Sequence, residues 1–136
     1  MIQKIEYRNQ TLAIILRCAY RSEGITFFTP ESYSLQLGYM SRPSGYEIEA
    51  HLHLPVDRKI ELTNEVLFIK SGKVKIDFYS EEKIFVSSVI LVSGDVVLLA
   101  RGGHGLQMLE ASEIIEVKQG PYSGEADKLK FEANSA

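Results

Sequence analysis

The 136-residue sequence contains a single cysteine, Cys18, so no disulfide can form within the chain. Nothing therefore indicates an oxidising compartment. Cys18 has no evident helix N-terminus or basic cluster beside it to activate the thiol, and we interpret it as a small hydrophobic residue. No apolar run is long enough to span a bilayer, and the run 12–16 is too short for a signal peptide. We expect a cytoplasmic protein with no membrane partner.

The sequence also lacks a surplus of positive charge. It has 15 lysine and arginine residues against 18 aspartate and glutamate residues, giving a formal net charge of −3. Nucleic-acid-binding domains usually carry clustered basic residues, whereas here they are scattered, and we expect no nucleic-acid partner. No P-loop, Rossmann glycine fingerprint or Ser-His-Asp order is present.

Helix signals are scarce, whereas strand signals recur along the chain. The length and the 45% hydrophobic content fit one globular domain. We expect strands at 34–40, 46–53, 106–108 and 114–118, two or three more within 2–28, and a polar helix or tail from 122 onward. The run 65–79, broken at Ser71-Gly72, predicts a hairpin, and 84–99 predicts two strands around a turn at 93–95. Within 73–78, alternation places Val74, Ile76 and Phe78 in the core. Many short strands indicate an all-β sandwich or barrel.

The chemistry of the sequence centres on its three histidines. His51 and His53 are two residues apart in an expected strand, so their side chains lie on the same face. Neutral imidazole is the commonest metal ligand in proteins, and a third histidine, His104, lies near a glycine cluster. The pattern therefore predicts a metal site. The alternative is that these are exposed surface histidines.

The expected strand around the histidines has two unlike faces. Its polar face carries Glu47, Glu49, His51 and His53. The other face is apolar and carries Tyr46, Ile48, Ala50, Leu52 and Leu54. An exposed apolar stripe of this length is a liability, so we expect N-terminal strands or a second subunit to cover it. Glu47 and Glu49 are then candidates for groups inside the cavity, or Glu47 lies at its exposed rim.

Two motifs resemble those of the cupin superfamily. The first runs from Gly45 through five residues to His51 and His53, then to Glu65, six residues and Gly72. The second runs from Gly94 through five residues to Ala100, Gly102 and His104, with alanine where the family has proline. The resemblance covers Gly45 to about Met108, nearly half of the chain.

The resemblance implies a double-stranded β-helix, or jelly-roll, barrel of the cupin type. On this reading residues 1–136 form a single cupin domain, with N-terminal strands 1–44, a cupin core 45–120 and a polar C-terminal tail 121–136. The implied metal ligands are His51, His53, Glu65 and His104, with Glu61 as the alternative carboxylate. Such a shell suits one divalent ion of Fe, Mn, Ni, Cu or Zn without choosing among them. The resemblance also implies a homodimer.

The function implied by the resemblance is that of a metal-dependent enzyme acting on a small polar molecule, similar to a sugar or a carboxylate. Isomerisation, epimerisation or oxygenation, in carbohydrate metabolism, are the expected reaction classes. Glu49 is the candidate group for moving a proton. Arg58, Arg42 and Gln107 are candidate substrate-binding residues, the alternative being plain surface or packing positions. A non-catalytic binding or sensing cupin is the alternative function.

Overall fold

The computed structural model describes residues 1–124 and 126–133, and all of its regular elements are strands. The first five strands are β1 (Ile2–Tyr7), β2 (Gln10–Leu16), β3 (Gly24–Phe27), β4 (Gly38–Ser41) and β5 (Glu65–Ser71). The remaining five are β6 (Lys73–Tyr79), β7 (Phe85–Val92), β8 (Val96–Leu99), β9 (Gly103–Met108) and β10 (Glu113–Lys118). The all-β class expected from the sequence is confirmed. No helix in these described ranges could cross a membrane.

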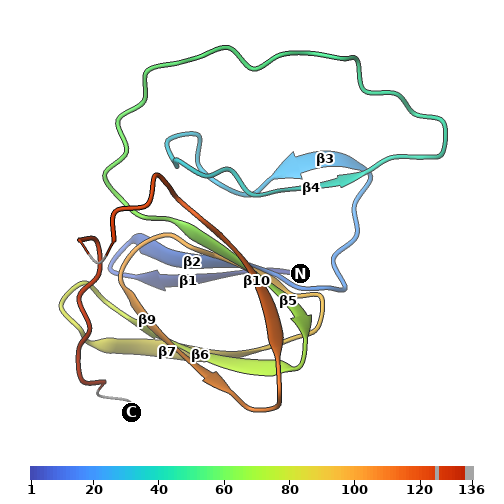
Figure 1. Cartoon of the computed structure of the whole chain (residues 1–136). Helices are drawn as coiled ribbons and strands as arrows, with labels where there is room; N and C mark the ends of the chain where they lie inside the picture. Colours follow the sequence, from blue (N-terminus) through green and yellow to red (C-terminus); the bar gives the residue numbers. More distant parts are fainter. Residues whose placement is uncertain (125, 134–136) are drawn as a thin grey trace.

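The strands form three antiparallel sheets (Figure 1). The largest has the order β1-β2-β8-β5-β10, a second has the order β7-β6-β9, and β3 and β4 form a two-stranded ribbon. The first two sheets pack face to face as a sandwich. β10 is the last strand of one sheet and β9 the last strand of the other, and the chain passes directly from β9 to β10. These two strand edges therefore lie on the same side of the sandwich.

The core lies between the five-stranded and three-stranded sheets. Strand alternation sends one set of side chains from each sheet inward. The buried members include Ala13, Ile15, Leu67, Ile69, Val97 and Leu99 from one sheet and Val74, Ile76, Phe78, Val89 and Leu91 from the other. The expectation that Val74, Ile76 and Phe78 face the core is confirmed.

A second apolar cluster covers the outer face of the five-stranded sheet. Ile14 of β2 and Leu98 of β8 are in register and fully buried there. The segment that connects β3 to β4 packs on them through Phe28, Tyr33, Leu35 and Leu37. Because β2 and β8 are covered on both faces, their continuous apolar sequences have a physical reason.

The hairpin expected at Ser71-Gly72 is wrong. β5 pairs with β8 and β10, whereas β6 pairs with β7 and β9, so Gly72 turns the chain from one sheet into the other. Gly72 has a φ of 95°, in the left-handed region that glycine adopts without strain. Two strands joined by a hairpin have the same alternating sequence pattern as two strands joined by a corner between sheets. The pattern alone therefore does not distinguish the two connections.

The strand expected at 46–53 does not form. Residues 42–64 run from β4 to β5 in a wide arc beyond the β3–β4 ribbon (Figure 1). Alternation was sufficient to predict a strand, but a strand also needs a neighbour for its backbone hydrogen bonds, and none lies beside this segment. The side chains of Leu52 and Leu54 are 86% and 74% exposed.

Candidate functional site

A cavity of about 530 Å³ lies at one end of the sandwich. Its walls come from the start of β5, the start of β9, the end of β10 and the C-terminal segment 127–133. Glu65 and His104 are both among the residues that line it. The two positions come from different sheets and lie 39 residues apart in the sequence, by their numbers.

The strand registers explain why these two side chains face the same cavity. Residues in register in an antiparallel pair lie on the same face of their sheet. His104 is in register with Phe78, whose side chain is buried in the core, so His104 points inward. Glu65 is two residues before buried Leu67 and also points inward from the opposite sheet.

β10 adds a carboxylate and an amine to the same inner wall. Glu116 is in register with Leu67, and Lys118 is in register with Glu65, so both belong to the inward set. Lys118 lines the cavity directly. Both residues are exposed, because β10 is the edge strand of its sheet, so their charges stay in contact with solvent at the open side of the sandwich.

His104 has a perturbed acidity. Burial lowers its pKa below the usual 6.5, whereas the carboxylates of Glu65 and Glu116 act to raise it and Lys128 acts to lower it. The net lowering favours the neutral imidazole at neutral pH. A neutral imidazole keeps a lone pair available to accept a proton or to bind a metal ion.

The C-terminal segment closes one side of the cavity. The ring of Phe131 lies 5.2 Å from that of Tyr79, edge to face. A Cβ atom added at Gly103 would lie 2.9 Å from the tip of the Phe131 ring, so a larger residue there would have to displace this ring. At the rim, the Thr63 hydroxyl donates a hydrogen bond of 2.8 Å to the carboxylate of Asp127.

The Thr63–Asp127 contact gives a direct test of this arrangement. The hydrogen bond from Thr63 is the main cause that lowers the pKa of Asp127 from its usual 3.8, with smaller help from Lys118. We expect Thr63→Val to raise the pKa of Asp127 towards 3.8, measured by NMR titration of the side-chain carboxyl. Because the folded pKa is the lower one, the contact stabilises the fold above about pH 3.8 and is lost as the pH falls further. An unchanged pKa in Thr63→Val would show that the C-terminal segment does not lie here.

The two paired histidines lie elsewhere. His51 and His53 are on the exposed segment 42–64, with ring centroids 5.2 Å apart, and neither lines the Glu65–His104 cavity. The Nδ1 atom of His51 lies 2.8 Å from the backbone oxygen of Glu49, within hydrogen-bonding distance. The Glu49 side chain is exposed on the same segment.

The three predicted substrate-binding residues also lie outside this cavity. Arg58 is exposed on the 42–64 segment, and the Arg42 guanidinium stacks over the ring of Tyr46 at 4.5 Å. Gln107 is on β9, in register with Lys75, so it lies on the opposite face of the strand from His104.

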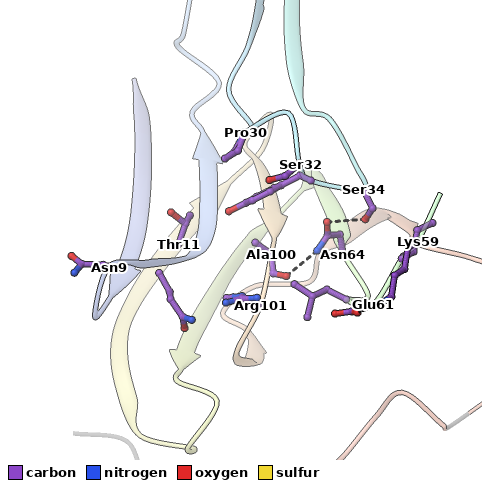
Figure 2. Close-up of a pocket in the computed structure, with 14 residues that line it drawn as sticks. Asn9, Thr11, Pro30, Ser32, Ser34, Lys59, Glu61, Asn64, Ala100 and Arg101 are labelled. Carbon is purple, nitrogen blue, oxygen red and sulfur yellow. Dashed lines mark hydrogen bonds and ion pairs between the residues drawn. The ribbon is translucent and has the colours of Figure 1, made fainter. Parts of the chain in front are cut away.

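A second cavity, of about 570 Å³, lies near the β1–β2 turn (Figure 2). Asn64 supports its wall by accepting a 3.1 Å hydrogen bond from the Ser34 hydroxyl and donating one of 2.8 Å to the backbone oxygen of Ala100. Glu61 lines this second cavity and pairs with Lys59 at 3.1 Å. Of the two carboxylates considered as metal ligands, Glu65 therefore shares a cavity with His104 and Glu61 does not.

Sequence reasoning did not identify several residues that shape the Glu65–His104 cavity. Thr63, Tyr79 and Phe131 belong to no motif, and they reach the cavity only through the packing of distant segments. The polar sequence around Asp127 gave no sign that this part of the chain covers a cavity. The inward position of Glu116 could have been found from its place in the 114–118 alternation, once the pairing with β5 is known.

As placed, the four expected metal ligands do not form one site. Two share a cavity and two lie on the exposed segment, and the described ranges contain no group of three or more His, Cys, Asp or Glu side chains arranged to hold a metal ion. Comparison with protein-family models, with curated proteins and with solved structures gave no match to this chain.

Proposed function

We propose that this chain is a metal-dependent enzyme of the cupin type, which binds a small polar molecule in the Glu65–His104 cavity. The observation that supports this proposal is that Glu65 and His104 line the same cavity. Two sequence motifs singled them out separately, and the fold brings them from opposite sheets into one cavity. A pocket with a few convergent polar groups and a histidine of perturbed pKa is a common form of active site.

The chain's own residues suit a small anionic or polyhydroxylated molecule. Lys118 on the cavity wall would pair with a carboxylate. Neutral His104 would accept a proton or hydrogen bond, and Glu65 would hold a hydroxyl or act as a base. Phe131 and Tyr79 add an aromatic wall on the side of the C-terminal segment. A bound metal ion would add the ability to polarise a carbonyl oxygen or to acidify a water molecule.

Metal content is the test of this function. We expect purified protein, reloaded separately with Mn²⁺, Fe²⁺, Ni²⁺, Cu²⁺ or Zn²⁺ and desalted, to retain about one ion per chain by elemental analysis. The double variant His51→Ala, His104→Ala should lose it, and Glu65→Ala should retain much less. Glu113→Ala is the matched control, because Glu113 is an exposed carboxylate that accepts a hydrogen bond from Ser71 at the far end of β10.

No ion in the wild-type protein after reloading would overturn the metal-dependent function. The alternative would then be a non-catalytic binding protein that holds its ligand by hydrogen bonds. The second cavity favours this alternative, because uncharged hydrogen-bonding residues (Asn9, Gln10, Thr11, Ser32 and Ser34) line it beside the charged Lys59, Glu61 and Arg101.

A further inference from the structure

We propose that the second cavity, of about 570 Å³, is a separate binding site for a small polyhydroxylated anion, such as a sugar acid or a sugar phosphate. It lies beside the apolar cluster on the outer face of the five-stranded sheet, because Tyr33 and Ala100 belong to both. Its volume is in the usual range of small-molecule sites. Among the described residues, it shares no lining residue with the Glu65–His104 cavity, so the inference does not rest on the metal-dependent function.

The lining of this cavity combines hydrogen-bonding groups with apolar surface. Five of the lining residues are polar and uncharged: Asn9, Gln10, Thr11, Ser32 and Ser34. The ring of Tyr33 and the side chain of Leu62 add apolar surface to the same cavity. A sugar ring presents hydroxyl groups at its edge and C–H groups on its faces, so it would use both kinds of surface. A bare inorganic anion would leave the apolar part unused.

Asn64 joins three of the segments that surround the cavity. It is 3% exposed, and its side chain accepts a hydrogen bond from Ser34 and donates one to the backbone oxygen of Ala100 (Figure 2). Within the part of the chain that the structure describes, these bonds use only one of its two amide hydrogens. A buried amide hydrogen without a partner costs free energy. Because Asn64 lines the cavity, a ligand oxygen that accepts this hydrogen would be favoured.

Arg101 supplies the positive charge for the anionic group. Its Nε atom lies 3.7 Å from a carboxylate oxygen of Glu81, an exposed residue that does not line the cavity. Its two terminal nitrogens have no partner among the described residues, and such a fork binds a carboxylate or a phosphate in bidentate fashion. The other charged lining residues, Lys59 and Glu61, pair with each other at 3.1 Å. The positive charge of Arg101 is therefore the one left for a ligand.

The backbone fixes two sides of the cavity before a ligand binds. The amides of Ala100 and Arg101 both donate to the backbone oxygen of Leu12, at 2.8 and 3.4 Å. On the opposite side, Arg8 and Asn9 have φ angles of 50° and 63°, which form the tight β1–β2 turn that places Asn9 at the cavity. Polar groups that are already fixed lose less conformational freedom on binding, which favours affinity.

Two-dimensional NMR titration with defined sugars tests the site without any assay of activity. The probes are glucose 6-phosphate and gluconate, and glucose and inorganic phosphate represent the two halves of the ligand separately. We expect at least one of the two sugar anions to bind with a Kd of about 1 mM or below and to shift the amide signals of Thr11, Ser34 and Arg101. It should bind at least about tenfold more tightly than glucose or phosphate alone, because both parts of the lining are then used.

Three variants locate the bound anion. Arg101→Gln should weaken binding at least about tenfold, because the charged bidentate contact is lost. Asn9→Gly should weaken it about threefold by removing one carboxamide, without strain, because glycine adopts a φ of 63° freely. Arg8→Gln is the matched control. It removes the same charge from the β1–β2 turn, but Arg8 does not line the cavity, so the Kd should change by less than about twofold.

Three results would overturn the inference. The first is the absence of shifts at the cavity with either sugar anion at up to about 10 mM. The second is equal binding of inorganic phosphate and the sugar anions, which would show that the hydroxyl groups are not recognised. The third is binding that Lys118→Gln abolishes and Arg101→Gln does not, because it would place the anion in the Glu65–His104 cavity.

The same titration separates this inference from the proposed function. Binding that depends on Arg101, in a protein that retains no metal ion after reloading, would contradict the metal-dependent function and leave the second site intact. Retention of the metal ion without any binding at the second cavity would have the opposite meaning. The double variant His51→Ala, His104→Ala should bind the sugar anion as the wild-type protein does, because neither histidine lines the second cavity.

Discussion

Replacing Gly72 with alanine is expected to lower the free energy of unfolding by about 4 kcal/mol. Gly72 turns the chain from β5 into β6 with a φ of 95°. An added Cβ atom would overlap the Ser112 hydroxyl and lie 2.5 Å from the backbone oxygen of Ala111. The neighbouring atoms include the backbone of the β9–β10 connection, which cannot move aside without disturbing the second corner of the sandwich. Urea unfolding followed by circular dichroism measures the change.

Gly45→Ala separates the two causes of this loss. Gly45 has a similar φ of 85°, but a Cβ atom there would have no neighbour within 4 Å. Its replacement should therefore cost only the backbone strain, about 1 kcal/mol. If the two substitutions destabilise the protein equally, the close approach of Gly72 to the β9–β10 connection is not present in solution.

Replacing Asp95 with alanine is expected to lower the free energy of unfolding by about 3 kcal/mol. The Asp95 side chain is 1% exposed and lies in the turn between β7 and β8. Its carboxylate accepts hydrogen bonds from the Cys18 amide at 2.8 Å, the Val92 amide at 2.8 Å and the Arg17 guanidinium at 3.1 Å. Alanine would remove all three hydrogen bonds, and the largest cost comes from the amides left without partners.

Asp77→Ala is the control for Asp95→Ala. Asp77 accepts a 2.7 Å hydrogen bond from Ser88 and pairs with Lys75 at 3.6 Å, but on the outer face of its sheet. A more exposed pair of this kind contributes about 0 to 1 kcal/mol. Comparable losses in the two variants would mean that the Asp95 network does not join the end of β2 to the start of β8. Chemical unfolding of both variants under identical conditions makes the comparison.

Side-chain alternation predicts where the strands lie better than it predicts which strands pair with each other. It placed Val74, Ile76 and Phe78 in the core correctly because inward and outward positions are a local property of one strand. Pairing depends on loops and corners that bring distant strands together. Alternation alone therefore predicts a hairpin at Ser71-Gly72, where the chain turns from one sheet into the other. It also predicts a strand at 46–53, where no other strand lies alongside.

The sequence predicted a shared location for four residues, and two of them, Glu65 and His104, share a cavity in the structure. Glu65 and His104 are both motif positions, and both lie on paired strands of the sandwich. Strand geometry fixes the direction of each side chain there, and both side chains face one cavity. His51 and His53 lie on a segment that makes no backbone hydrogen bonds to a neighbouring strand. Their spacing in the sequence therefore predicts how near they are to each other, but not where they lie relative to the sandwich. Their role as metal ligands stays a prediction.

The position of β8 has a consequence for the nascent chain. β2 and β5 do not pair with each other, and β8 lies between them in the sheet. β2 therefore obtains its second neighbour only after Val96–Leu99 has left the ribosome. Synthesis of residues 17–95 takes on the order of 4 to 16 s at ordinary translation rates. During that interval the β1–β2 hairpin exposes Ala13, Ile14 and Ile15, all buried in the native protein, and it is the part of the growing chain with the greatest need of protection from aggregation.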